Sequence, residues 1–433
     1  MTKLSPKRTN KLNSKFLIFN WTLFDFGNTS FSIVVVTFLY AVYFKKIIVS
    51  GLPEGDLYWS WAISISMLIT SVIAPVLGAI ADYSAGKKRF LLFFTIICIV
   101  ATANLFFLKE GDVFWGILLF IIANIGFEAG LVFYDSFLPD ITTEKNFGRV
   151  SGYGYGMGYL GSLVTLTIAY PFIQNDMIKE TFPLAAVFFL IFSIPLFLFI
   201  RDDRKEKKSS VNYLRIGFLR VWETVSNLKK FKNLALFLLA YFFYIEGVNT
   251  VIFFSGNYAS STLSFSFTEL ILFFIIVQST AIIGSVIFGI VADSFGYKKT
   301  IITSLIIWIF TILFAFITSD ASNWIVLQTS EYFTLSTLET EKKYFYFVGL
   351  LAGSVMGATQ SVSRSLMSVL VPINKKTEFF GFFSMFGKSS AIVGPLVFGL
   401  ISYIFESQRL AILSIAVFFV VGLLILLKVE EKQ

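Results

Sequence analysis

The chain has 433 residues, of which 56% are hydrophobic and only 14% are charged. Soluble domains average about 25% charged residues, so this composition excludes a water-soluble globular protein. The sequence contains no histidine and one cysteine, Cys98. Histidine-based catalytic triads, histidine zinc sites, a histidine proton relay and an internal disulfide are therefore excluded.

Apolar runs long enough to cross a bilayer as helices, about 20 residues each, recur along the chain. The first run is too long for a signal peptide and no small-residue cleavage site follows it, so we expect a retained helix. The sequence therefore predicts an all-α polytopic membrane protein. The twelve predicted spans are about 16–44, 58–80, 90–108, 112–138, 148–173, 183–200, 234–258, 267–291, 300–318, 343–371, 377–404 and 409–427.

The distribution of Lys and Arg predicts the orientation. Twelve spans place both termini on one side, which carries 26 of the 35 basic residues, whereas the opposite side carries 7. The positive-inside rule then places both termini in the cytoplasm, and we expect the inner membrane of a bacterium. The net charge of +8 follows from this bias, so it does not indicate nucleic-acid binding.

A basic linker, 201–232, divides the chain into an N-terminal six-helix bundle (1–200) and a C-terminal one (233–433). Within the linker, apolar residues recur at helical spacing between basic ones, which predicts an amphipathic helix on an anionic membrane surface. These apolar residues are Leu214, Phe218, Trp222, Val225 and Leu228.

The two predicted bundles are related by internal repeats. "GAIADYSAGKKR" (78–89) and "GIVADSFGYKK" (289–299) both read Gly-x-x-x-Asp followed by a turn and basic residues. "P…G..S..G…G" recurs in spans five and eleven with a constant offset of 233, and "Asp-x-x-Asn-Thr" at 25–29 is echoed by "Glu-x-x-Asn-Thr" at 246–250. The sequence therefore predicts a duplicated six-helix unit.

Two such bundles joined by a basic loop resemble the major facilitator superfamily, whose members bind substrate between their halves and rock around it. The Gly-x-x-x-Asp loops resemble that superfamily's signature, although the first copy has one extra residue before its Gly86. We expect Asp82 and Asp293 to accept hydrogen bonds at helix ends near the cytoplasmic face and so to brace the outward-open state. The resemblance implies a gating role for Asp82, Lys87, Lys88, Arg89, Asp293, Lys298 and Lys299.

A narrower resemblance covers nearly the whole chain. "WTLFDFGNTSF", "FYDSFLPDIT", "GRVSGYGYGMGYLGS", "YIEGVNT" and "QSVSRSLMSVLVP…EFFGFFSMFGKSSAIVGPL" are similar to the signatures of the vacuolar-effluxer-like, autophagy-related family, also called the unknown major facilitator family. Its fungal members imply amino-acid efflux. The chain departs from the family pattern by having Glu246 where Asp is more usual and Asp135 where Asn is more usual.

Six charged residues fall inside predicted spans, away from their ends, where the membrane penalises charge and function is the default hypothesis. They are Asp25, Glu128, Asp135, Glu246, Arg364 and Lys388. The alternative for each is a structural ion pair or a side chain that reaches toward the interface. Asp25 shares a helix face with Asn28, and Glu246 shares one with Asn249, because each pair is three residues apart. We expect the two acids to face each other across the transport path, where they take up a proton or hold Na⁺.

Other polar residues favour a substrate site in the same region. Arg364 and Gln360 lie on a small and polar stripe of span ten, which is typical of a packed or cavity-facing surface. Arg364 either neutralises Asp135 or Glu128 or binds a substrate carboxylate. The "GFFSMFGKS" segment around Lys388 is not a phosphate-binding loop, because its glycines are too far apart and no strand precedes it. The glycines of span five indicate close helix packing.

These features predict a secondary active transporter of a small polar or zwitterionic solute, with amino acids favoured by the resemblance and H⁺ or Na⁺ as the coupling ion. We expect a monomer in the lipid bilayer, no enzymatic activity, and no cofactor or bound metal. Two alternatives stay open. The 53 Phe residues suit transport of an amphiphile such as a lysolipid, and a transporter-like receptor would bind a solute without moving it.

Overall fold

The computed structural model describes residues 11–52, 54–84, 86–202 and 213–431. The basic N-terminal residues before 11, the extra loop residue Ala85 and the charged run 203–212 lie outside the described residues. Every regular element within the described ranges is a helix, and the predicted all-α fold is confirmed. The first half contains α1 (Lys11–Phe31), η1 (Ser32–Thr37), α2 (Leu39–Tyr43), η2 (Phe44–Ile48), α3 (Glu54–Ser84), α4 (Lys87–Asn104), η3 (Leu105–Phe107), α5 (Val113–Asp135), α6 (Leu138–Ile141), η4 (Glu144–Asn146), α7 (Phe147–Gln174) and α8 (Thr181–Phe199).

A linker helix, α9 (Tyr213–Ser226), and the short η5 (Leu228–Phe231) lead into the second half. The second half contains α10 (Lys232–Ser261), α11 (Phe267–Phe295), α12 (Tyr297–Thr318), α13 (Trp324–Phe333), α14 (Thr337–Leu370), η6 (Ile373–Lys375), α15 (Lys376–Ile404) and α16 (Gln408–Leu426). In the part of the chain that the structure describes, eleven helical spans are long and apolar enough to cross a membrane. The 29-residue α15 packs between α3, α10 and α16 as the twelfth long helix.

The first predicted span is not one continuous α-helix. The α-helix ends at Phe31 and the chain continues as the π-helix η1. Phe38 then departs from helical geometry, with φ −123° and ψ −76°. The sequence Ile-Val-Val-Val-Thr at 33–37 explains the break, because consecutive β-branched side chains crowd the preceding helical turn. The wider turn is visible in a hydrogen bond of 3.1 Å from the Phe38 N–H to the Ile33 carbonyl, five residues back. Turns of this kind inside membrane helices often occur at functional sites.

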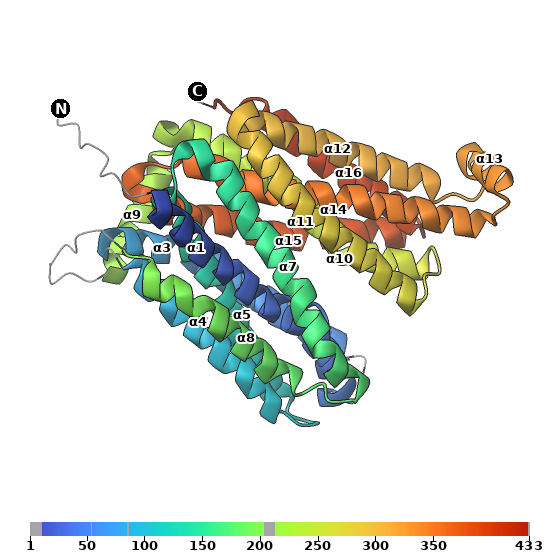
Figure 1. Ribbon diagram of the computed structural model, residues 1–433, viewed down its shortest axis with the longest axis horizontal. Coiled ribbons are helices and arrows are strands. Elements are labelled where there is room, and N and C mark those ends of the chain that lie inside the picture. Colours follow the sequence, from blue (N-terminus) through green and yellow to red (C-terminus); the bar gives the residue numbers. More distant parts are fainter. Residues whose placement is uncertain (1–10, 53, 85, 203–212, 432–433) are drawn as a thin grey trace.

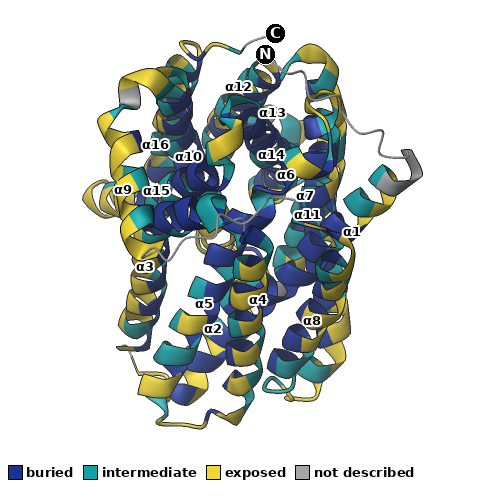
Figure 2. Cartoon of the chain, turned by 90° about the vertical axis from the view of Figure 1, so that its left-hand side faces the viewer, coloured by how far each residue is buried: buried dark blue, intermediate teal, exposed yellow. Residues whose placement is uncertain are grey.

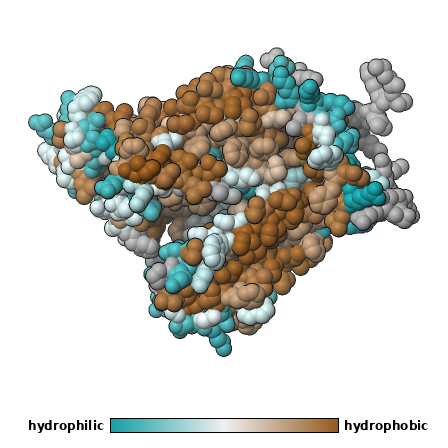
Figure 3. All heavy atoms as spheres, turned by 180° about the vertical axis from the view of Figure 1, so that it is seen from behind, coloured by the Kyte–Doolittle hydropathy of each residue, from teal (hydrophilic) through white to brown (hydrophobic). Residues whose placement is uncertain are grey.

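The two halves touch at one end and diverge at the other (Figure 1). We call the end near the two chain termini the closed end and the opposite end the open end; the surface is hollowed between the halves toward the open end (Figure 3). The most extensive contacts between the halves are those of α3 with α15 and of α7 with α11. Glycines allow these helices to approach backbone to backbone: an added Cβ at Gly78 would overlap Thr377, and one at Gly148 would overlap the Gly289 carbonyl.

The side chains sort as expected for a membrane protein. Buried residues gather between the helices, and exposed ones lie on the outside (Figure 2). Much of that outer surface is apolar, with the hydrophilic residues concentrated toward its ends (Figure 3). Two peripheral helices stand out. The amphipathic α9 was predicted, but the prediction included Leu228, whereas α9 ends at Ser226 and Leu228 begins η5. The short α13 was not predicted, even though Asn323 caps its start by accepting a hydrogen bond from the Ile325 N–H at 3.0 Å.

Candidate functional site

The centre of the molecule is organised around Arg364 of α14, which is only 2% exposed. Its Nη1 lies 2.8 Å from Oδ1 of Asp135 and 3.5 Å from Oδ2 of Asp25. Its Nε donates to the Ser151 hydroxyl at 2.8 Å, and its Nη2 donates to the Ser151 carbonyl at 2.9 Å. A guanidinium of the C-terminal half is therefore held by three residues from three helical segments of the N-terminal half.

Aromatic rings surround this guanidinium. Its carbon lies 4.7 Å from the ring centre of Trp21, 5.7 Å from that of Tyr134 and 4.4 Å from that of Tyr155. Trp21 and Tyr134 stack with their ring centres 4.6 Å apart, and the Tyr134 hydroxyl donates to Oδ2 of Asp25 at 2.7 Å. Aromatic faces attract cations most strongly where water is excluded, so the cage and the carboxylates favour a positive charge at the same point.

A glycine makes room for the ion pair. Gly154 of α7 lies beside Arg364 and Asp25, and a Cβ added there would stand 2.7 Å from Arg364 Nη2 and 2.7 Å from Asp25 Oδ2. The same helix approaches α1 at Gly161, where an added Cβ would overlap the Phe26 carbonyl. The glycines of α7 thus alternate between two partners, with Gly148, Gly152 and Gly156 against α11 and Gly154, Gly158 and Gly161 against the site and α1.

A second ion pair also crosses between the halves. Lys388 of α15 contacts Glu128 of α5, whose side chain is 7% exposed. With Arg364, Asp25 and Asp135, the cluster therefore contains three carboxylates and two cationic groups. In their ordinary charge states these five groups leave one surplus negative charge. Such a charge is costly in a low-dielectric interior unless a cation or a proton accompanies it.

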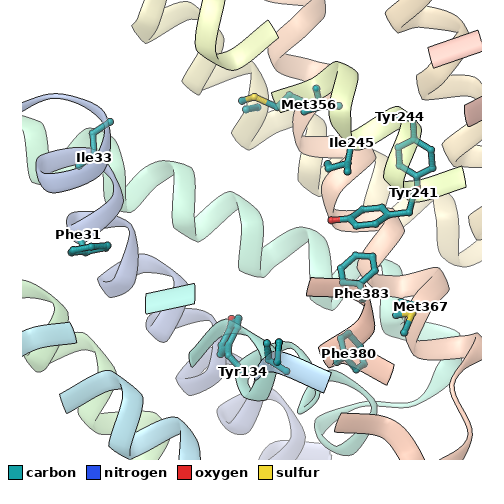
Figure 4. Close-up of a cluster of buried hydrophobic side chains, with 14 of the residues drawn as sticks. Phe31, Ile33, Tyr134, Tyr241, Tyr244, Ile245, Met356, Met367, Phe380 and Phe383 are labelled. Carbon is teal, nitrogen blue, oxygen red and sulfur yellow. The ribbon is translucent and has the colours of Figure 1, made fainter. Parts of the chain in front are cut away.

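Polar side chains extend the cluster toward the open end. Asn28 donates to Oδ1 of Asp25 at 3.3 Å, and the Tyr159 hydroxyl donates to Oε1 of Gln360 in the opposite half at 2.6 Å. Tyr241 of α10 stacks on Phe383 with ring centres 4.1 Å apart. Figure 4 shows the Tyr241 hydroxyl pointing toward the N-terminal half.

Glu246 does not face Asp25, so that expectation is wrong. Glu246 is fully buried and accepts a hydrogen bond from the Gly394 N–H of α15, within its own half. Its Oε2 has no hydrogen-bond partner among the described residues. Asn249 likewise donates to Ser390 of α15, at 3.3 Å. The two acids differ because of their neighbours. Gly394 has no side chain, so α15 packs closely on α10 and its backbone binds Glu246. Asp25 instead pairs with Arg364 of the other half.

The two Gly-x-x-x-Asp loops bind crosswise at the closed end. Asp82 of the N-terminal half accepts a hydrogen bond of 2.8 Å from the Glu378 N–H in the first turn of α15. Asp293 of the C-terminal half accepts one of 2.7 Å from the Gly148 N–H and one of 3.2 Å from the Arg149 N–H, in the first turn of α7. Each carboxylate therefore caps a helix N-terminus of the opposite half, where the helix dipole favours negative charge.

The lysines of these loops contact groups of their own halves. Lys87 is buried, pairs with Asp140 and donates to the Ser136 carbonyl at 3.1 Å. Three further contacts stay within one half: Lys88 donates to the Ile200 carbonyl, Lys298 donates to the Leu427 carbonyl, and Lys299 lies over the Phe295 ring. Arg89 lies exposed in the first turn of α4. Two other cations bridge the halves here: the Lys376 Nζ lies 2.8 Å from Asp140 Oδ1, and the Arg149 Nε lies 2.6 Å from Asp293 Oδ2.

The structure places at the site several residues that were not predicted as site residues. Trp21, Ser151 and Gly154 contact the Arg364 cluster. The helical spacing of Trp21 and Asp25 was a usable signal, because residues four apart share a helix face. Ser151 and Gly154 carried only the signature of close packing, which does not tell which partner they approach.

Comparison with known proteins agrees with this architecture. The family model described as "Vacuole effluxer Atg22 like" matches residues 58–433. The MFS-type transporter YxiO of Bacillus subtilis is 31% identical over 430 residues, covering 95% of this chain and 94% of that protein. Autophagy-related protein 22 of Kluyveromyces lactis is 25% identical over 393 residues, covering 84% and 77%.

Among solved structures, a bacterial homologue of the iron transporter ferroportin in an outward-facing state has a TM-score of 0.70 at 12% identity, with 96% of this chain and 98% of that chain covered. At that identity the likeness shows the fold alone. The fold, the site between two helical halves and the sequence relatives lead to one conclusion: the chain is an integral membrane protein with the major facilitator fold and belongs to the vacuole effluxer Atg22-like family.

Proposed function

We propose that this protein is a secondary active transporter of a small zwitterionic solute, most simply an amino acid, and that it works by alternating access coupled to H⁺ or Na⁺. The observation that carries the proposal is the Arg364–Asp135–Asp25 cluster, which joins the two halves and contains both signs of charge. Buried charges at the junction of two moving halves are typical of substrate and ion sites in such proteins.

The cluster has the chemistry that an amino acid requires. A guanidinium offers a planar fork that matches a carboxylate, while Asp25 and Asp135 suit an ammonium group. Trp21 and Tyr155 present ring faces that also favour a cation. In the arrangement described here Arg364 is paired with the two aspartates. A bound zwitterion replaces these internal pairs with equivalent external ones, so its binding conserves the number of ionic contacts.

The surplus negative charge supports ion coupling. When a zwitterion brings no net charge, one carboxylate of the cluster still lacks a cation. A proton or Na⁺ supplies that charge before the site closes, because closure removes the water that solvates it. Asp25 is well placed for this role: it lies at the edge of the cluster and already accepts from Tyr134 and Asn28.

The two ends of the molecule supply the gates. In our proposal the closed end faces the cytoplasm, as the Lys and Arg bias predicts, and the protein lies in a bacterial inner membrane as a monomer. The form described here is then outward-open, with Asp82 and Asp293 holding the halves together through helix N-termini. The transport cycle requires these contacts to break while an equivalent closure forms at the open end.

Counterflow of labelled amino acids in proteoliposomes tests the proposal. The wild type should exchange substrate, and Arg364→Gln should lose exchange, because the buried aspartates then repel each other without a cation. Arg409→Gln is the matched control: Arg409 also pairs with one aspartate, Asp320, at 2.8 Å, but both side chains are about 30% exposed and far from the cluster. This control should retain exchange.

Two results would overturn the proposal. Exchange of lysolipids but not amino acids would assign an amphiphile as the substrate. Amino-acid binding with no flux in either direction would make the protein a receptor.

A further inference from the structure

The linker helix α9 lies across the junction of the two halves at the closed end. On one side it presses onto α3, where an added Cβ at Gly217 would stand 2.7 Å from Ile80 and 3.0 Å from Val76. Gly217 therefore brings the α9 backbone into direct contact with the N-terminal half. The helix begins at Tyr213, after the charged run 203–212, and its contact with α3 fixes its position on the bundle.

On its other side α9 contacts the C-terminal half at η6 and at the start of α15, where the buried acid Glu378 is the partner of two of its side chains. The Thr224 hydroxyl donates to Glu378 in the first turn of α15, and the Arg220 Nε lies 3.6 Å from the same carboxylate. Arg220 also donates to the Asn374 carbonyl at 3.2 Å. The Glu378 N–H also donates a hydrogen bond to Asp82 of α3. One residue of α15 therefore joins α3 and α9.

The remaining face of α9 is apolar and uncovered. The exposed fractions are 72% for Trp222, 62% for Phe218, 62% for Leu214 and 56% for Leu219. Figure 2 shows this helix at the periphery beside α3 and α15, with exposed residues outward. So large an apolar face is not stable against water, and each of these side chains favours burial by about 1.5–3 kcal/mol.

The surroundings of this face indicate what covers it. Leu68, Val72 and Val76 form one row on α3, because they are spaced by four residues. Val76 lies under Gly217, whereas Leu68 and Val72 are 58% and 62% exposed toward the outside of the bundle. The apolar face of α9 thus continues the lipid-facing surface of α3. Lys229 and Lys230, directly after α9, add exposed basic groups, which suit anionic lipid headgroups.

We propose that α9 is a membrane-surface latch: a leaflet containing anionic lipid binds its apolar and basic face and thereby stabilises the form in which α3 and α15 touch. The inference rests on the alternating access proposed above. Separation of α3 from α15 forces α9 to give up either Gly217 on α3 or Glu378 on α15. A lipid surface that holds α9 in its present place therefore binds one form better than the other, and this difference shifts the equilibrium.

Pulsed EPR distances on the full chain test the latch without any substrate. Spin labels at Gln174→Cys and Tyr403→Cys, at the open ends of α7 and α15, report how far the halves diverge; the native Cys98 is buried. In vesicles containing phosphatidylglycerol the wide distance should dominate. Trp222→Ala should lower the ratio of wide to narrow distances by about tenfold in those vesicles, which corresponds to about 1.4 kcal/mol. In phosphatidylcholine alone the variant and the wild type should be alike.

Trp115→Ala is the matched control, since Trp115 is a 57% exposed tryptophan at the open end. It should leave the ratio unchanged in both lipids. Glu378→Gln should lower the ratio even with phosphatidylglycerol, because it weakens the contact that the lipid supports. The latch is overturned if Trp222→Ala acts equally in both lipids or no more than Trp115→Ala. Cross-linking between copies through Trp222→Cys would assign the face to a second copy and overturn it as well. If the distances are as expected but the wild type exchanges no amino acid, only the proposed function is contradicted.

Discussion

Asp293 in the C-terminal half accepts a hydrogen bond of 2.7 Å from the Gly148 N–H in the N-terminal half, and Gly148 itself packs on the Gly289 carbonyl of the same opposing helix. A carboxylate and a glycine one turn apart along α11 therefore act on the same point of α7. The glycine lets the backbones meet, and the carboxylate caps the helix that arrives. Asp82 repeats the capping at Glu378. At the closed end, therefore, each half supplies a carboxylate that caps a helix N-terminus of the other half.

Asp293→Asn should weaken this closure. The amide keeps the size of the side chain but removes its charge, so the pairing with Arg149 and the favourable interaction with the α7 dipole are lost, a change of about 1–2 kcal/mol. We expect slower transport with nearly unchanged substrate affinity, measured as turnover and half-saturation in proteoliposomes. A collapse of affinity with normal turnover would contradict the gating role. Asp320→Asn, on a partly exposed pair at the open end, is the control.

Gly154→Ala should disrupt the central cluster. The added methyl would stand 2.7 Å from both Arg364 Nη2 and Asp25 Oδ2, so the ion pair must shift in a packed interior. We expect a loss of stability of about 1–3 kcal/mol and loss of exchange. Gly256→Ala is the control, because an added Cβ there meets no atom within 4 Å; it should be neutral or slightly stabilising in a thermal unfolding assay. Equal effects of the two substitutions would show that the Gly154 contact does not matter.

Lys388→Met should leave Glu128 as an uncompensated buried acid. Breaking a buried pair by removing one partner costs about 3–5 kcal/mol when both groups are enclosed, and less here because Lys388 is 23% exposed. The double variant Lys388→Met with Glu128→Gln should recover much of the lost thermal stability. If the double variant is as unstable as the single one, the contribution of Lys388 is packing rather than charge.

Asp25→Asn should separate coupling from binding. If Asp25 carries the coupling proton, the amide mimics its neutral form. Flux driven by a pH gradient is then lost, while counterflow survives in part. If Asp25 instead binds the substrate ammonium, both assays fail, with a loss of affinity of about 10- to 150-fold for a lost charged hydrogen bond.

Glu246→Gln supplies the comparison, because Glu246 is also buried but lies away from the cluster. Wild-type gradient-driven flux in both variants would show that neither acid couples transport. Loss of gradient-driven flux in Glu246→Gln alone would move the coupling site into the C-terminal half.

Much of the architecture follows from the sequence by itself. Long apolar runs, their number and the internal repeats predict two groups of membrane helices, because a bilayer satisfies only helices or closed barrels. The Gly-x-x-x-Asp loops also indicated carboxylates at helix ends, since a helix N-terminus carries partial positive charge wherever it occurs. Asp25 and Arg364 stood out as charges in apolar runs, which is a property of composition and position alone.

Tertiary structure decided which of these residues meet. Arg364 is 339 positions from Asp25, and nothing local fixes their distance of 3.5 Å. The repeat placed Asp25 and Glu246 at equivalent positions. Among the described residues, however, a cation from the other half pairs with Asp25 but not with Glu246, and the Gly394 backbone binds Glu246 within its own half. Duplication gives the two halves similar sequence patterns. The contacts of a given acid, however, depend on whether a particular neighbouring side chain is present. The partners of a buried charge are therefore set by packing across the chain, and the sequence shows only that the charge needs one.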